Sequence, residues 1–308
     1  MRYLYLTVCI FSIIYTQSTI AEFSFKKILN SVMPSKIIQD TIFEEYNPKQ
    51  ASLFTLQNKR GNIAISTDNS QKTIFLKAIK KAYKPEDLSK LTFQQKTNGQ
   101  EFIIEITYDA ATIDGSIDFE IIIPSQLALN VSTEEGSVTI KNTNAPARIS
   151  TAKGTIEVIN AHNSVDAITH EKGSITFHKP SGRIKAQTNS GNIFIHDAQS
   201  TVIADTHYGS IEMYAKEVPS TSTINLTTIS GSIMLHLPPD VNADLKAYTK
   251  HGMITSDHFI TLKPQTTQLN RQAWKRLQKQ INGIIGTGEA QIKLSSVRSD
   301  IKLLEIKA

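Results

Sequence analysis

Ile184-Lys-Ala-Gln-Thr-Asn-Ser-Gly-Asn-Ile-Phe-Ile-His196 is followed 18 residues later by Val202-Ile-Ala-Asp-Thr-His-Tyr-Gly-Ser-Ile-Glu-Met-Tyr214. In both stretches, apolar residues alternate with other residues before and after a central glycine. A period of two predicts β-strands with one buried face. Each unit therefore predicts a strand of about five residues, a tight turn ending at glycine, and a second strand of similar length.

The same unit recurs along much of the chain. Its glycines are spaced by 18, 19, 18, 18, 22 and 21 residues, and they are Gly136, Gly154, Gly173, Gly191, Gly209, Gly231 and Gly252. Self-similarity at this period indicates stacked repeats, each burying its apolar face against its neighbours. We therefore predict an all-β fold: a β-solenoid, or parallel β-helix-like stack, of about 18–22-residue repeats. A serial β-hairpin meander is the alternative chain path.

Two polar features accompany the turns. The glycine is expected to supply a positive backbone dihedral. Threonine precedes most of the glycines by three residues, at Thr133, Thr151, Thr188, Thr206, Thr228 and Thr249. The alternation turns these hydroxyls inward, where we expect them to bond turn amides that are otherwise buried. His170 interrupts this column before Gly173, and the neighbouring apolar residues are shifted, which predicts a β-bulge.

The ends of the array are predicted to be capping copies of the unit. Residues 54–65 form a first copy, and residues 292–303 form a last copy in which Ser299 replaces the glycine. The pattern stops at 264–282, where residues 270–280 predict a short amphipathic helix. We therefore expect a single β-solenoid domain at 49–308 that contains this helical insertion, preceded by a lead-in segment at 22–48.

The first 21 residues predict a signal peptide. Met1-Arg2 is basic, residues 4–14 are mainly apolar, and Thr19-Ile-Ala21 predicts cleavage after Ala21. The apolar run is shorter than the about 20 residues that a membrane span needs. We therefore expect an exported protein in the periplasm, at the cell surface or outside the cell. The single cysteine, Cys9, lies in this segment, so we expect no disulfide in the processed chain.

Charge and motifs narrow the function classes. The net charge of +5 comes from interspersed acids and bases, so we expect no nucleic-acid partner. All eight histidines lie between residues 162 and 258, but a flat column rarely converges on one ion, so no metal and no cofactor are predicted. Asp197, Asp205 and Glu212 are scattered and belong to no catalytic motif. We predict no catalytic residues and no enzyme.

Four stretches resemble the bacterial putative-adhesin family, which consists of extracytoplasmic β-solenoid domains of unknown function. They lie at residues 56–65, 117–138, 235–252 and 286–303. The chain departs from the family pattern at Ser299 and in the 264–282 insertion. The resemblance implies a β-solenoid fold and a location outside the cytoplasm, and it offers no catalytic residues to carry over.

The candidate binding residues are outward-facing positions three and five residues after the later glycines. They are Phe194, His196, Glu212, Tyr214, Met234 and His236. If the coils stack in register, these side chains form one surface, which we expect to bind a protein or a glycan on a cell surface or in the envelope. In the alternative interpretation, the 264–282 segment, with Trp274 and Leu277, covers them.

The sequence thus predicts an exported, non-enzymatic, adhesin-like binding or display module at the cell envelope or surface. Two alternatives stay open: an envelope scaffold that self-associates through its terminal coils, and an envelope-stress sensor module. A polysaccharide-acting β-helix enzyme is disfavoured, because such an enzyme needs acids and bases grouped in one cleft.

Overall fold

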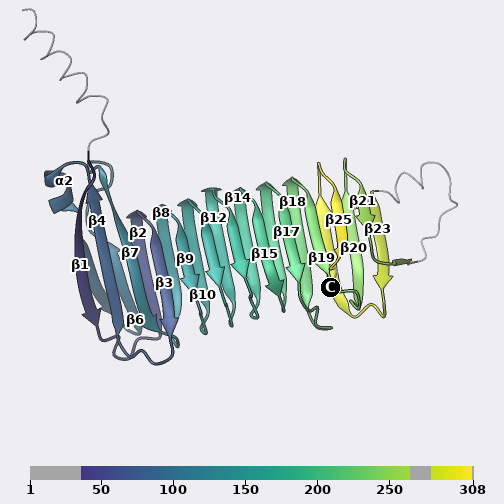
Figure 1. The fold of residues 1–308 in the computed structure, drawn as a ribbon, viewed down its shortest axis with the longest axis horizontal. Coiled ribbons are helices and arrows are strands. Elements are labelled where there is room, and N and C mark those ends of the chain that lie inside the picture. The colour runs from purple at the N-terminus through teal and green to yellow at the C-terminus, as the bar shows by residue number, and fades with distance from the viewer. Residues whose placement is uncertain (1–35, 264–278, 307–308) are drawn as a thin grey trace, which may run out of the picture.

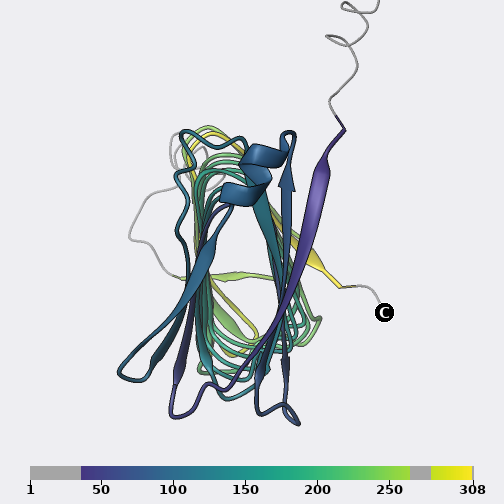
Figure 2. The same ribbon diagram turned by 90° about the vertical axis from the view of Figure 1, so that its left-hand side faces the viewer.

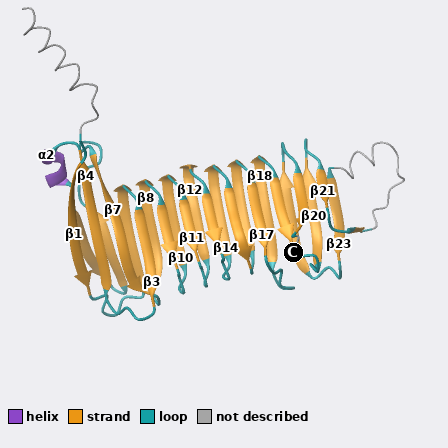
Figure 3. Ribbon diagram, in the orientation of Figure 1, coloured by secondary structure: helices purple, strands orange, loops and turns teal. Residues whose placement is uncertain are grey.

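The computed structural model of the chain describes residues 36–263 and 279–306. Within these residues, two long β-sheets face each other along the molecule (Figure 1), and helix is confined to α2 (Pro85–Lys90) (Figure 3). The predicted signal peptide, at 1–21, lies outside the described residues. In spatial order, the twelve described strands of sheet A are β1 (Ile38–Tyr46), β4 (Ile74–Ala82), β7 (Gly115–Pro124), β3 (Ile63–Asp68), β9 (Val138–Lys141), β11 (Ile156–Ile159), β13 (Ile175–His178), β15 (Ile193–Ala198), β17 (Ile211–Ala215), β19 (Ile233–Leu237), β25 (Ile301–Glu305) and β21 (Ile254–Ser256).

Sheet B lies opposite sheet A and closes the other side of each coil. Its thirteen described strands, in spatial order, are β22 (Thr261–Leu262), β23 (Gln280–Ile285), β20 (Ala243–Thr249), β24 (Ala290–Ser296), β18 (Thr223–Ser230), β16 (Val202–Tyr208), β14 (Ile184–Ser190), β12 (Val165–Lys172), β10 (Ala147–Lys153), β8 (Ala128–Glu135), β2 (Leu53–Arg60), β6 (Glu101–Ile106) and β5 (Phe93–Asn98).

Each coil places one strand in each sheet, joined by the glycine turn. Strand β14 leads through Gly191 into β15, and the next coil repeats this path with β16 and β17. The equivalent strands pair in parallel, with Ile184 beside Val202 and Ile193 beside Ile211. The predicted β-solenoid is therefore confirmed, and the hairpin meander is wrong. Viewed along the stack, successive coils superimpose (Figure 2).

The alternation places one apolar column against another between the sheets. Ile175, Phe177, Ile193 and Ile195 of sheet A are all fully buried, as are inward residues of sheet B such as Val165 and Ala167. Burial of branched apolar side chains is the main favourable contribution to folding in such a core. Because each coil contacts mainly the next one, the core is continuous along the stack.

The glycine column is required by the close stacking of the turns. A Cβ atom at Gly209 would lie 2.0 Å from the carbonyl oxygen of Gly191, and one at Gly191 would lie 2.1 Å from that of Gly173. Positive φ angles occur at some of these glycines, such as 150° at Gly136, but not at Gly209 or Gly231. The shared requirement is therefore space between coils, and not the dihedral that the sequence analysis expected.

The inward threonines bond these same turns. The Thr206 hydroxyl donates to the Gly191 carbonyl at 3.0 Å, and the Thr228 hydroxyl donates to the Gly209 carbonyl at 2.9 Å. Each bond joins a threonine to the glycine of the preceding coil. The sequence predicts that these hydroxyls bond turn amides, and this prediction is only partly right, because they mainly donate to turn carbonyl oxygens. Thr249 also accepts a bond from the Gly252 amide at 3.0 Å.

The predicted bulge lies in β12. Register between β10 and β12 shifts after Thr151, which pairs with Thr169 instead of His170. Thr169 is buried, and its hydroxyl donates to the Gly173 carbonyl at 3.1 Å. One extra residue before the turn therefore restores the threonine to the inward column, which explains the 19-residue interval.

The spatial order of the coils differs from the chain order at both ends. The last unit, β24–β25, lies between β18–β19 and β20–β21, so it does not cap the stack as predicted. The first unit, β2–β3, likewise lies between β6–β7 and β8–β9. All coils share one inward pattern, so the pattern identifies coils without specifying their neighbours.

Antiparallel strands close the two ends. β1 pairs with β4, which pairs with β7, and β1 lies obliquely across the N-terminal end (Figure 2), with Tyr46 5.4 Å from Phe102 of sheet B. β1 falls in the predicted lead-in at 22–48 but belongs to sheet A. At the other end, β23 pairs antiparallel with β20 and β22. Of the predicted 264–282 insertion, residues 264–278 lie outside the described residues, and 280–282 are strand, not helix.

We predict that Gly209→Ala destabilises the fold by about 3 kcal/mol, because its methyl group must displace the preceding coil. Ser299→Ala is the matched control, since that coil already accommodates a side chain where the others have glycine. Chemical denaturation of both variants measures the difference. Equal stability of the two variants would show that the close approach does not constrain the stack.

We also predict that Thr206→Val lowers the free energy of unfolding by about 1 to 2 kcal/mol, because the Gly191 carbonyl loses its buried donor. Thr206→Ser keeps a hydroxyl at the same position and should recover much of the loss. Thermal denaturation compares the two variants. A serine variant as unstable as the valine variant would assign the loss to packing.

Candidate binding surface on sheet A

The outer face of sheet A carries two rows of side chains that cross its strands. The first row is Glu45, Phe75, Ile122, Ser66, Lys141, Ile159, His178, His196, Tyr214, His236 and Leu304. The second row is Phe43, Lys77, Glu120, Ala64, Thr139, Glu157, Thr176, Phe194, Glu212, Met234 and Lys302. All six predicted binding residues lie in these rows, on β15, β17 and β19, and each is half-buried.

Four rings of the first row form a stack, here called the ring column: His178, His196, Tyr214 and His236. Successive ring centroids are 5.2, 5.5 and 3.9 Å apart, and the planes of neighbouring rings differ by 8°, 20° and 8°. The stack continues across a local irregularity after His196, where Asp197 has a φ of 58°. Parallel strands in register place the same repeat position of each coil side by side, which is why the rings meet.

Glu212 connects the two rows. Its carboxylate accepts a hydrogen bond from the Tyr214 hydroxyl at 3.0 Å, and this bond, aided by partial burial, raises the pKa of Tyr214 above its ordinary value. The same carboxylate lies 3.4 Å from Nε2 of His236, and the two form an ion pair when the imidazole is protonated. Nε2 of His236 is buried and has no hydrogen bond among the described residues. Phe194 and Met234 flank Glu212 in the second row.

The ring column presents ring edges to a partner. Rings that stack on one another use their faces, so a partner meets mainly their edges. Of the polar atoms on these edges, the Tyr214 hydroxyl is bonded to Glu212 and Nε2 of His236 is buried. A sugar that packs on an aromatic face finds the inner faces already occupied. The geometry therefore favours a partner that offers polar groups to the edges and apolar groups to Phe194 and Met234.

The three histidines of the ring column lie in a row and do not converge on one point. In the part of the chain that the structure describes, no group of three or more histidine, cysteine, aspartate or glutamate side chains is placed to hold a metal ion. Two His–Glu pairs occur instead, His178 with Glu157 at 3.6 Å and His236 with Glu212 at 3.4 Å. Each pair joins neighbouring coils, so these carboxylates contribute to the contacts between coils.

The segment proposed as a cover for this surface lies mostly outside the described residues, including Trp274 and Leu277. Its two flanking strands, β22 and β23, belong to sheet B and not to the face that carries the ring column.

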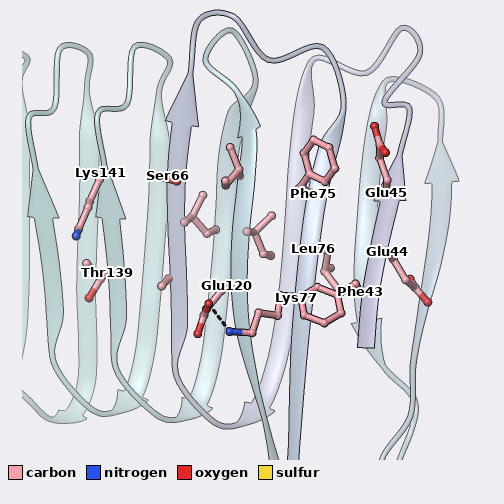
Figure 4. A pocket seen from close by; sticks show the side chains of 14 residues that line it. Phe43, Glu44, Glu45, Ser66, Phe75, Leu76, Lys77, Glu120, Thr139 and Lys141 are labelled. Atoms are coloured by element: carbon pink, nitrogen blue, oxygen red, sulfur yellow. Dashed lines mark hydrogen bonds and ion pairs between the residues drawn. The ribbon is translucent and has the colours of Figure 1, made fainter. Parts of the chain in front are cut away.

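A second feature of the same face was missed by the sequence analysis. A groove of about 710 Å³ lies over β1, β4, β7, β3 and β9 (Figure 4). Phe43, Phe75 and Ile122 border it with exposed fractions of 74%, 44% and 43%, values that are high for large apolar side chains. The sequence features that could have predicted the groove are apolar residues at outward positions, as in Ile121-Ile-Ile123 and in the phenylalanines of β1 and β4.

Small side chains make the groove hollow. Ala64 and Ser66 of β3 form its floor, between Ile122 on β7 and Lys141 on β9. Lys77 and Glu120 form an ion pair of 3.0 Å beside it (Figure 4). The groove thus combines an apolar centre with charged side chains.

The outer face of sheet B has a different character. Its outward residues in the middle of the central strands are mostly polar or charged, with Ile168 and Ile203 as apolar exceptions: Asn130, Ser132, Arg148, Ser150, Asp166, Lys185, Gln187, Asp205, Asn225 and Thr227. Exposed large side chains also occur on sheet B nearer the glycine turns, at Tyr208, Ile229 and Tyr248. What distinguishes sheet A is that its aromatic side chains adjoin one another across neighbouring strands, whereas Tyr208 of sheet B lies between Ser190 and Ser230. The outer face of sheet A is therefore the candidate binding surface.

Fold and surface together define a β-solenoid with one face rich in aromatic and apolar side chains. The family model described as Toastrack DUF4097 matches residues 39–304, so the chain belongs to that family. This confirms the resemblance noted from the sequence. A comparison with curated proteins found no match. No helix in the described part of the chain has the length and apolar character needed to span a membrane.

A search of solved structures found matches to proteins from Bacteroides, Clostridium and Parabacteroides. A "putative adhesin" from Bacteroides fragilis is 13% identical over 86% of this chain and 97% of its own, with a TM-score of 0.48. A "putative cell adhesion protein" from Clostridium sporogenes is 11% identical over 88% and 100%, with a TM-score of 0.28. A "putative adhesin" from Parabacteroides merdae is 8% identical over 88% and 97%, with a TM-score of 0.28. Likenesses at this level show no shared ligand.

We predict that Tyr214→Leu lowers the free energy of unfolding by about 1 to 2 kcal/mol, because two ring contacts are lost. Tyr214→Phe keeps both ring contacts and loses only the partly exposed hydrogen bond to Glu212, so it should lower the free energy of unfolding by about 0.5 kcal/mol. Chemical denaturation measures both values. If the leucine variant is as stable as the phenylalanine variant, the ring column does not stabilise the stack.

Proposed function

We propose that this protein is an exported, non-enzymatic binding module whose outer sheet A face contacts a partner at the cell envelope or surface. The observation that supports this proposal is the contrast between the faces. Sheet A places Phe194, Tyr214 and Met234 outward, whereas the corresponding positions of sheet B are mainly polar. Aromatic and methionine side chains at exposed positions are enriched in protein interfaces.

The partner that fits best is a protein. The ring column places imidazole and phenol groups on four adjacent strands, and the neighbouring row supplies apolar contacts at Phe194 and Met234. A protein surface can match both, whereas a glycan that stacks on aromatic rings would find the inner faces of the ring column occupied. The rigid stack presents these groups without ordering cost, which favours affinity.

An enzymatic role has less support. The outer carboxylates near the ring column, Glu157 and Glu212, each lie beside a histidine of the next coil, and neither lines the groove over the N-terminal strands of sheet A. A general base must be placed to take a proton from a bound substrate.

The scaffold alternative depends on the ends of the stack. Sheet edges attract further strands when they are long and unpaired. Here β21 has three residues and β22 has two, while the edge strand β1 carries Asp40, Glu44 and Glu45. Short and charged edges disfavour end-to-end pairing, so the binding module is the better-supported function. The sensor alternative requires the same partner contact.

To test the proposal, a photocrosslinking amino acid replaces Phe194 on sheet A or Ile203 on sheet B in the producing cells. Both side chains are half-buried, outward and in adjacent coils, so they form a matched pair. We expect a covalent adduct from position 194 and little from position 203. Mass spectrometry then identifies the adduct as a protein or a glycan.

Equal adducts from the two faces, or none from position 194, would contradict the proposal. A Phe194→Ser, Tyr214→Ser double variant that still folds should lose the contact. Protease treatment of intact cells, with lysed cells as control, determines where the contact takes place. Removal of the protein from intact cells indicates a surface location, and protection indicates one inside the envelope.

A further inference from the structure

The outward side chains of the groove over the first five strands of sheet A change in charge and in size from one side of the groove to the other. Across β1, β4, β7, β3 and β9, the first row presents Glu45, Phe75, Ile122, Ser66 and Lys141. An acid stands at one side and a base at the other. A bulky ring follows the acid, and a small side chain precedes the base.

The second row repeats the order of sizes. Phe43 stands on β1 and Thr139 on β9, with the small Ala64 next to Thr139. Large side chains therefore gather over β1 and β4, and the hollow lies over β3 (Figure 4). Within the described residues, Glu45 and Lys141 take part in no ion pair, whereas Lys77 and Glu120 pair with each other.

We propose that this groove is the interface of a two-fold symmetric dimer, and that its occupant is a second copy of this chain. A two-fold axis parallel to the strands and passing along β7 reverses the order of the strands and keeps each row facing itself. Glu45 then faces Lys141 of the partner subunit. Phe75 enters the hollow at Ser66 of the partner subunit, and Ile122 meets Ile122 of the partner subunit. Such a self-complementary patch is what an isologous interface requires.

The second row fits the same arrangement. Phe43 faces Thr139 of the partner subunit, and Lys77 faces Ala64 of the partner subunit. The two Glu120 side chains approach each other at the axis, and each keeps Lys77 of its own subunit at 3.0 Å as a countercharge. The large exposed fractions of Phe43, Phe75 and Ile122 are removed from water together, which supplies the favourable term.

The area of the overlap indicates that the dimer is weak. Five strands about 4.8 Å apart, overlapping over about six residues of 3.3 Å each, give a footprint of about 500 Å² per subunit. Standard interfaces bury about 800 Å² per partner, so we expect a reversible dimer that dissociates at micromolar concentration. The ring column begins at β13, beyond this overlap, and stays free for a partner. The dimer and the proposed function can therefore fail separately.

Charge reversal provides the decisive experiment. The processed chain is studied by sedimentation velocity from about 1 to 100 µM, a range chosen to bracket a micromolar dissociation constant. We expect dimer formation by the unaltered protein. Glu45→Lys and Lys141→Glu should each weaken it by at least tenfold, because each variant places two like charges opposite each other. The double variant restores opposite charges and should dimerise within about threefold of the unaltered protein.

The controls separate the dimer from other effects. Lys185→Glu, on the outer face of sheet B, should leave dimerisation unchanged. Phe75→Ser should weaken it and should leave the fold intact by circular dichroism, since this side chain points away from the core. A monomer throughout the concentration range would overturn the proposal. So would a double variant that associates as weakly as the single ones, or a dimer that survives both Phe75→Ser and the charge reversals.

Discussion

The structure depends on how closely one turn can approach the next. At the stacked glycines, a coil rests on the carbonyl oxygen of the preceding turn with no room for a side chain on the glycine above it, and a buried hydroxyl satisfies that oxygen. Together these contacts set the register of every coil on its neighbour. Register in turn decides which side chains share a face, because a one-residue shift would exchange core and surface. The apolar core and the ring column both follow from this spacing.

The same spacing explains how a repetitive scaffold obtains two unlike faces. A repeat position facing the core accepts little besides branched apolar side chains, so it stays uniform along the stack. An outward position is free to vary, and neighbours along a row always meet because the strands are parallel. Glu212 shows the result: with Tyr214 of its own strand and His236 of the next coil, it forms one polar cluster without any loop to position these side chains. In this fold, a surface cluster is formed by side chains of neighbouring coils and not by one continuous segment of the chain.

Most of the fold could be predicted because it follows from sequence patterns inside single repeat units. Alternation, glycine spacing and the threonine column are properties of single units, so the coils, the bulge at Thr169 and the side-by-side placement of the six candidate residues could be anticipated. The groove could not, because Phe43, Phe75 and Ile122 come from three separate segments that meet only through β1–β4–β7 pairing. Helix α2 was missed although Pro85, Glu86 and Asp87 give it an ordinary helix start. The order of the terminal coils was missed because identical inward patterns carry no information about neighbours.

The position of β24–β25 has a consequence for how the chain folds. This coil is made last, yet it separates two coils that are made before it. Growth of the stack from the N-terminal side must therefore halt at β18–β19 until the final residues arrive, and β20–β21 has no lasting neighbour until then. Pairings of such large sequence separation slow folding. A chain that emerges N-terminus first, as from the ribosome, would therefore complete this part of the stack only after β24–β25 has emerged.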